Sequence, residues 1–111
     1  MDNIKNDAYF VEKILTDIDF ILLHMENVSK TEFSANEVLQ DSMMFRLVQI
    51  SENAGKLTEE FKAANGKIPW GDISGLRNRI VHDYGNVDLT IVYDTLTNDV
   101  PYLKKTISGT V

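Results

Sequence analysis

The chain has no cysteine among its 111 residues. This absence excludes a disulfide framework, a thiolate metal site and a cysteine nucleophile, and it fits a reducing cytoplasm. No apolar run exceeds four residues, far below the roughly 20 that span a bilayer, so we expect no membrane span and no secretion signal. We therefore expect a single cytoplasmic domain over residues 1–111, with no metal site and no membrane association.

Positive charge is scarce. The chain has 11 basic and 17 acidic residues, a formal net charge of −6, and a pI near 4.7. Proteins that bind nucleic acid over a broad surface usually carry a basic patch that displaces counterions from phosphates. Two of the three arginines, Arg77 and Arg79, lie in one short segment, so any contact with RNA is expected at a focused site. The acidic charge also fits a basic protein partner, or solubility alone.

Glycine and proline are few, and apolar residues recur at helical spacing along most of the chain. One apolar stripe predicts a first helix within residues 4–29. A second helix is predicted from Ser34 to about residue 64, because Ser34 and Glu37 have the spacing of a capping box. Gly66 is the expected stop of this helix.

Residues 67–76 are predicted to form a connector that plugs one end of the bundle, because a proline cannot lie inside a helix. Asp72 or Ser74 is expected to cap a third helix that runs to about Tyr84. A fourth helix is expected after Asp88, with a break or kink near Asp99 because Pro101 falls inside its pattern, and residues 108–111 are expected to fray. The fold class is therefore all-α, an antiparallel four-helix-type bundle with one short helix.

The segment Arg77–Tyr84 (RNRIVHDY) gathers residue types that suit RNA cleavage without a metal ion. A ribose 2′-OH must lose a proton as it attacks phosphorus, and the leaving 5′-oxygen must gain one. Histidine can serve either step near neutral pH, so His82 is the candidate proton-transfer group. A guanidinium can hold two phosphoryl oxygens as charge builds, which suits Arg77. Asn78 can orient His82 or donate to phosphate.

On an ideal helix Arg77 and His82 are about 140° apart, so they do not superimpose. One histidine is also thin for two proton transfers, and a two-fold dimer would bring a second copy of the segment to one cleft. On spacing alone, solvation or salt bridges to some of the 17 acidic residues are the more common explanation for such side chains. A histidine near a helix C-terminus is also favoured by the helix dipole alone.

Several segments, in order and at the usual spacing over residues 46–103, resemble the HepT toxin family of the HEPN superfamily. R-N-x3-H-x-Y at residues 77–84 is similar to the family motif R-x4–6-H-x-Y. The other matching segments are ISENAGKL at 50–57, IPW at 68–70 with Ile73, Gly75 and Leu76, Val87-Asp88, and Val100-Pro101-x-Leu103.

This resemblance implies a homodimeric helical bundle with a composite cleft, acting as a cofactor-free, metal-independent RNase toxin of a type II toxin–antitoxin module. It implies catalytic roles for Arg77, Asn78 and His82. The partner would be a cognate minimal nucleotidyltransferase antitoxin of the MntA type, which attaches AMP to the motif tyrosine, here Tyr84. We assign a weaker role in RNA backbone contact to Arg79.

Two alternatives stay open. The bundle can be a non-catalytic helical partner that helps a nucleotidyltransferase to bind its substrate, or a purely structural dimer. Tyr84 can also be an aromatic side chain that closes the core at the end of a helix.

Other conspicuous side chains have simpler explanations. His24 is predicted to lie in the core or in an interface, and Trp70 to pack against the core. We predict surface charges at Glu52, Glu59 and Glu60. We predict core or dimer-contact residues at Met25, Met43 and Met44.

Overall fold

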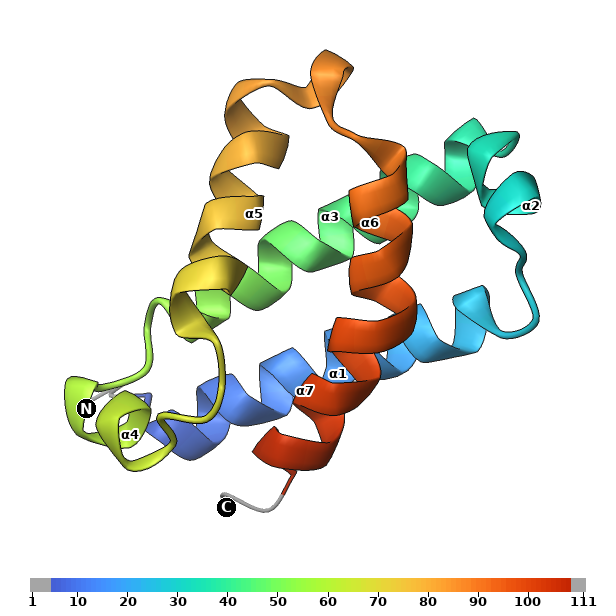
Figure 1. Ribbon diagram of the computed structural model, residues 1–111. Coiled ribbons are helices and arrows are strands. Elements are labelled where there is room, and N and C mark those ends of the chain that lie inside the picture. Colours follow the sequence, from blue (N-terminus) through green and yellow to red (C-terminus); the bar gives the residue numbers. More distant parts are fainter. Residues whose placement is uncertain (1–4, 109–111) are drawn as a thin grey trace.

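The computed structural model describes residues 5–108, in which every regular element is a helix. The elements are α1 (Asp7–Met25), α2 (Lys30–Ser34), α3 (Glu37–Ala54), α4 (Glu59–Ala64), α5 (Trp70–His82), the 3-10 turn η1 (Tyr84–Asn86), α6 (Leu89–Asp94), the π-helical segment η2 (Thr95–Asp99) and α7 (Val100–Ile107). The all-α prediction is confirmed. α1 and α3 lie side by side, and α5 and the α6–η2–α7 rod run in opposite directions across them (Figure 1).

α1 forms where the apolar stripe predicts it, but it spans residues 7–25 rather than 4–29. Asn6 caps its start by accepting a hydrogen bond from the Tyr9 N–H, and Asn27, with a φ of 60°, follows its end. Its buried face packs on α3, and Asp17 on that face accepts a 2.8 Å hydrogen bond from Arg46 of α3. The buried apolar residues of α1 are Val11, Ile14, Ile18, Ile21 and Met25.

The predicted capping box at Ser34 and Glu37 is wrong. The box lies five residues earlier, where the Ser29 side chain accepts from the Glu32 N–H and Glu32 accepts from the Ser29 N–H. The same S-x-x-E spacing occurs at both places, and burial decides between them, because the earlier start forms α2 and places Phe33 in the core. Asn36 then caps α3.

The predicted long helix to residue 64 is also wrong, because α3 ends at Ala54 and α4 is a separate short helix. The chain turns between them so that Leu57 is buried. Thr58 caps α4, and its N–H and hydroxyl both donate to the Asp7 carboxylate, at 2.8 and 2.7 Å. Helical periodicity does not predict this long-range contact with the start of α1.

α5 begins at Trp70, four residues before the predicted start, so Asp72 and Ser74 lie inside it and cap nothing. Proline fits at this boundary because it has no N–H to leave unpaired. The connector predicted over residues 67–76 is therefore shorter than expected, because residues 70–76 are helical. The packing predicted for its apolar residues is confirmed. Ile68 is buried, and the Trp70 ring lies against Phe61 while its indole N–H donates to a backbone carbonyl of α4.

The C-terminal rod begins at Asp88, whose side chain caps α6 as predicted. Where a break or kink was expected near Asp99, the helix has a widened turn, η2, which joins α6 to α7 without interrupting the rod (Figure 1). Pro101 lies in the first turn of α7. Because proline has no backbone N–H, it cannot donate one of the hydrogen bonds of a continuous helix. The prediction for residues 109–111 lies outside the described residues.

The core fills the space between α1, α3 and the C-terminal rod. Phe33, Met43, Val92, Leu96 and Ile107 are among its fully buried members. None of the helices within residues 5–108 is long and apolar enough to cross a membrane.

Candidate active site

α5 is held to the rest of the protein mainly through α3. Ile80 is its one fully buried residue, with Ile73 and Leu76 half-buried, so its other faces meet solvent. The motif residues occupy the last turns of this helix. They are therefore displayed at a surface by a regular helix that rests on α3.

Arg77 points toward α3 and is fixed there on three nitrogens. Its Nε and Nη2 donate to one oxygen, Oε2, of Glu52, at 3.1 and 2.7 Å, and its Nη1 donates to Asn78 Oδ1 at 3.0 Å. The Arg77 and Glu52 side chains keep 30% and 44% of their exposure, so a phosphate can still approach the guanidinium. The planar donor set of arginine suits such a fixed arrangement.

Glu52 is the residue that sequence reasoning missed. It was predicted to be a surface charge, and it is exposed, but it is also the ionic partner of Arg77. The only sequence signal was its place inside the 50–57 segment that resembles the HepT family, since 25 positions separate the two residues. Glu59 and Glu60 are exposed as predicted.

Asn78 contacts Arg77 rather than His82. Its carbonyl oxygen accepts from the Arg77 guanidinium, and within residues 5–108 it makes no hydrogen bond to the histidine four residues later. The N–H groups of its amide stay available as donors. Within the candidate site, Asn78 therefore acts together with Arg77 and does not orient His82.

His82 is the last residue of α5 and is exposed. No side chain of the described part of the chain hydrogen-bonds or ion-pairs with its imidazole. The alternative in which carboxylates satisfy the motif therefore applies to Arg77, which Glu52 binds, and not to His82. Both nitrogens of the imidazole are open to a substrate.

Tyr84 lies outside the helix, because α5 ends at His82 and Asp83 is its cap. The Tyr84 hydroxyl donates to Asp41 of α3, and 45% of the residue is exposed, so it does not close the core. Gly85 falls inside η1, and its φ is not positive.

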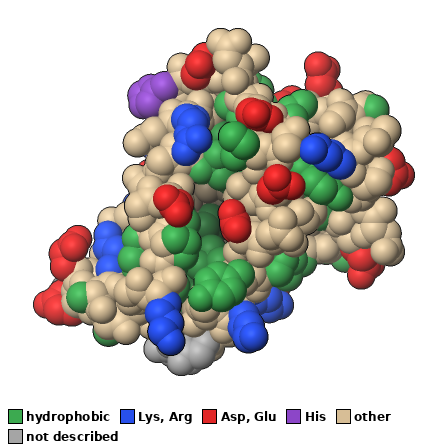
Figure 2. Space-filling model, viewed as in Figure 1, with side chains coloured by type: hydrophobic (Ala, Val, Ile, Leu, Met, Phe, Trp, Pro, Cys, Tyr) green, Lys and Arg blue, Asp and Glu red, His purple; other side chains and the backbone are tan. Residues whose placement is uncertain are grey.

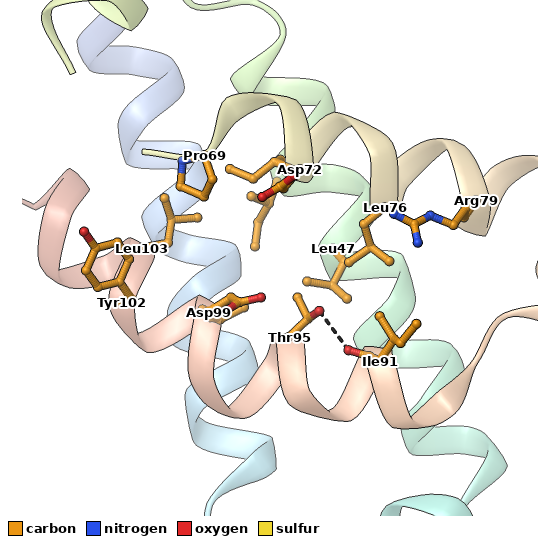
Figure 3. A pocket seen from close by; sticks show the side chains of 13 residues that line it. Leu47, Pro69, Asp72, Leu76, Arg79, Ile91, Thr95, Asp99, Tyr102 and Leu103 are labelled. Atoms are coloured by element: carbon orange, nitrogen blue, oxygen red, sulfur yellow. Dashed lines mark hydrogen bonds between the residues drawn. The ribbon is translucent and has the colours of Figure 1, made fainter. Parts of the chain in front are cut away.

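Arg79 is on the other side of α5 from Arg77, about 200° further around the helix. It lines a groove of about 280 Å³ between α5 and the η2–α7 part of the rod, which Leu47 and Ile50 of α3 also line. Figure 3 shows Asp72 and Asp99 on opposite walls, and Figure 2 shows hydrophobic side chains in the hollow with acidic ones along its edges. Arg79 has no ion-pair partner within residues 5–108.

The two polar partners that α3 supplies to the motif segment lie on one ridge of that helix. Asp41 and Glu52 share this face with Val38 and Phe45, because the four positions fall within about 60° around a helix. Val38 is 80% and Phe45 57% exposed, so this face presents apolar surface to solvent beside its carboxylates. We call these four residues the α3 ridge.

The remaining candidates are placed as follows. His24 is exposed on α1 with its ring 4.2 Å from that of Phe20, so it does not lie in the core of the chain, and its place in an interface stays a prediction. Met25, Met43 and Met44 are buried, as predicted for core residues. Within residues 5–108 no group of three histidine or acidic side chains is arranged to hold a metal ion.

The sequence profile of the family described as "Ribonuclease HepT-like" matches residues 14–109. The chain belongs to the HepT-like ribonuclease family. This match confirms the resemblance drawn from residues 46–103 and extends it into α1.

Relatives of this HepT-like chain carry names of the same kind. A protein of Caldanaerobacter subterraneus subsp. tengcongensis named "Putative RNase TTE0752" is 29% identical over 101 residues, which cover 91% of this chain and 90% of that protein. A protein of Thermococcus cleftensis named "Probable ribonuclease HepT" is 25% identical over 95 residues, or 86% of each chain. No solved structure gives a significant match.

Proposed function

We propose that this protein is a metal-independent endoribonuclease that acts as the toxin of a type II toxin–antitoxin system. The observation that carries the proposal is a guanidinium fixed on three nitrogens, five residues before an exposed histidine on the same helix that has no partner among residues 5–108. Membership in the HepT-like ribonuclease family supports RNA as the substrate.

The reaction needs no group beyond the chain and the RNA. The ribose 2′-oxygen attacks the adjacent phosphorus and loses its proton, and the bond from phosphorus to the 5′-oxygen breaks as that oxygen gains a proton. His82 transfers protons, while Arg77 and the free amide N–H groups of Asn78 stabilise the charge on the phosphoryl oxygens. The products are a 2′,3′-cyclic phosphate and a 5′-hydroxyl.

A homodimer built across the α3 ridge would supply the second histidine. Exposed Phe45 and Val38 favour this face, because a second copy seated there covers apolar surface and places both motif helices at one cleft. Phe45→Glu should then yield a monomer by sedimentation and abolish cleavage. Leu23→Glu, at a residue of α1 that is 69% exposed, is the matched control and should leave the dimer intact.

Silencing by a minimal nucleotidyltransferase antitoxin would occur at Tyr84. The tyrosine oxygen attacks the α-phosphorus of ATP, pyrophosphate leaves, and AMP adds bulk and negative charge two residues after His82. The exposed ring supports this role, and the hydrogen bond from Tyr84 to Asp41 must break first. Tyr84→Phe should block the mass gain on incubation with the partner enzyme and ATP. Tyr102→Phe, at a similarly exposed tyrosine, should not.

A second candidate is a non-catalytic subunit that helps a nucleotidyltransferase to bind its substrate. The observation that favours it is the ion pair between Arg77 and Glu52, since a guanidinium already held by a carboxylate can serve structure alone. RNA contact through Arg79 is a weaker part of the main proposal, because this residue lies on the groove side of α5.

RNA cleavage by the purified protein in EDTA separates these candidates. We expect wild type to cleave, and His82→Ala and Arg77→Ala each to lose about 10²–10³-fold in rate, with Lys105→Ala unchanged as the surface control. Mass spectrometry must show that Tyr84 carries no AMP. Unmodified wild type without activity would favour the subunit role.

A further inference from the structure

Basic side chains gather in a hollow of about 410 Å³ between α1 and α3, which we call the α1–α3 pocket. Its lining includes four of the chain's 11 basic residues, although the protein as a whole is strongly acidic. These residues are Lys5, Lys13, Arg46 and Lys56.

The carboxylates that line the pocket do not neutralise its lysines. Asp17 is bonded to Arg46 at 2.8 Å, and Glu52 is bonded to Arg77 at 2.7 Å, so each acid already has an arginine. No carboxylate among residues 5–108 pairs with the three lysines of the pocket. Three like charges that share one hollow repel each other, and an anion seated between them removes that cost.

Aromatic rings hold the lysines without cancelling their charge. The ammonium groups of Lys5 and Lys13 lie 4.9 and 5.8 Å from the centre of the Tyr9 ring, and that of Lys56 lies 5.8 Å from the centre of the Phe10 ring. Such contacts attract a cation through the ring's quadrupole. The ammonium groups are therefore positioned at the pocket and keep their full charge for an incoming ligand.

The pocket adjoins the candidate active site through a shared residue. Glu52 both lines the pocket and binds the Arg77 guanidinium. Lys56 follows Glu52 by four residues and lies in the turn just after the end of α3, so both residues stand at the same end of that helix. A nucleic-acid strand with one phosphate at Arg77 can thus place its neighbouring phosphates at Lys56 and then at Lys13 of α1 and Lys5 just before α1.

We propose that the α1–α3 pocket binds the phosphate backbone of single-stranded RNA next to the bond that is cleaved. This inference rests on the proposed function for the identity of the strand. It accounts for substrate binding by an acidic protein, since a few unpaired lysines beside the site attract phosphates without a broad basic face. It also assigns a role to Lys5, Lys13 and Lys56, which lie outside the motif.

The test compares two triple variants of equal charge in a His82→Ala background, which allows binding to be measured without cleavage. The pocket variant is Lys5→Gln/Lys13→Gln/Lys56→Gln. The control is Lys30→Gln/Lys67→Gln/Lys105→Gln, at exposed lysines that do not line the pocket and have no ion-pair partner within the described residues. Thermal unfolding by circular dichroism checks that both variants fold.

The readout is the fluorescence anisotropy of a labelled, short single-stranded RNA over a series of salt concentrations. We expect the pocket variant to raise Kd by about 10-fold or more and to reduce the slope of log K against log salt by about 2, as for three lost contacts to a single strand. The control should change Kd by less than about 3-fold, because its lysines contribute only to the overall field.

Equal weakening in the two variants, or no RNA binding by the parent, would overturn the proposal. So would ATP binding that the pocket variant loses while it retains RNA, because the pocket would then hold a nucleoside triphosphate. The cleavage assay is independent of these outcomes. If wild type fails to cleave while the pocket variant alone loses RNA, the RNase proposal fails and the binding site stands.

Discussion

The two arginines of the motif helix lie in contrasting surroundings, although they are only two positions apart. Arg77 faces α3, where Glu52 and Asn78 bind three of its nitrogens. Arg79 faces the apolar groove and has no ion-pair partner among residues 5–108. The comparison teaches that an arginine beside other basic residues is not enough to identify a site. What distinguishes Arg77 is that a second helix fixes its guanidinium where a substrate can meet it.

The largest expected effect is on stability, and it tests how α5, which carries both arginines, is anchored to the rest of the protein. Ile80→Ala should lower the free energy of unfolding by about 3 kcal/mol, because it empties the one fully buried position of α5. Val81→Ala is the matched control at a residue that is 47% exposed, and it should cost less than about 0.5 kcal/mol. Urea denaturation measures both values. Equal effects would mean that α5 is anchored elsewhere.

Charge-conserving substitutions sharpen the comparison of the two arginines directly. Arg77→Lys should slow RNA cleavage about 100-fold, or about 2.7 kcal/mol, since one ammonium cannot bridge Glu52, Asn78 and a phosphate at once. Arg79→Lys should slow it less than about 3-fold, because an unpaired guanidinium in the groove acts at most through its charge. A larger loss of rate in Arg79→Lys than in Arg77→Lys would mean that the groove side of α5, and not the side facing α3, carries the catalytic arginine.

Glu52→Gln tests whether fixing the guanidinium matters. It should lower kcat about 10-fold with little change in KM, because the amide still accepts a hydrogen bond but holds Arg77 less firmly. Its effect on stability should stay below about 1 kcal/mol for a half-exposed pair. Asp99→Asn, at the wall of the groove, is the control and should leave kcat unchanged. An unchanged kcat in Glu52→Gln would leave Glu52 with a structural role only.

The smallest expected effect concerns Glu32, whose carboxylate accepts a hydrogen bond from backbone rather than from arginine. It serves as a baseline for the effect of Glu52. Hydrogen bonds from the Ser29 backbone N–H and hydroxyl hold the pKa of Glu32 below its ordinary value of 4.5. Because the folded pKa is lowered, this stabilisation is fully present above pH 4.5 and is lost as the pH falls through the lowered pKa. Glu32→Gln should therefore lower Tm slightly near neutral pH and not at all in strong acid. A Tm difference that persists in acid would contradict this linkage.

Much of the fold was predictable because local sequence patterns specify where helices form. The apolar stripe of α1 recurs at helical steps, and Asp88 precedes its helix at the position of a cap, so both predictions are confirmed. The errors fall where two local signals compete. Two S-x-x-E patterns lie five residues apart, and the burial of Phe33 selects the earlier one. The turn that divides α3 from α4 similarly depends on Leu57 reaching the core and on Asp7 binding Thr58.

The candidate site divides in the same way. The sequence by itself determined the all-helical class, the family, and the presence of Arg77, Asn78 and His82 near the end of one helix, because periodicity and motif spacing are properties of neighbouring residues. Only the tertiary structure decided which side of α5 meets α3. That register brings Glu52 to Arg77 and Asp41 to Tyr84 across 25 and 43 positions of the chain. Contacts of this kind depend on how two helices pack, and no pattern within either helix specifies them.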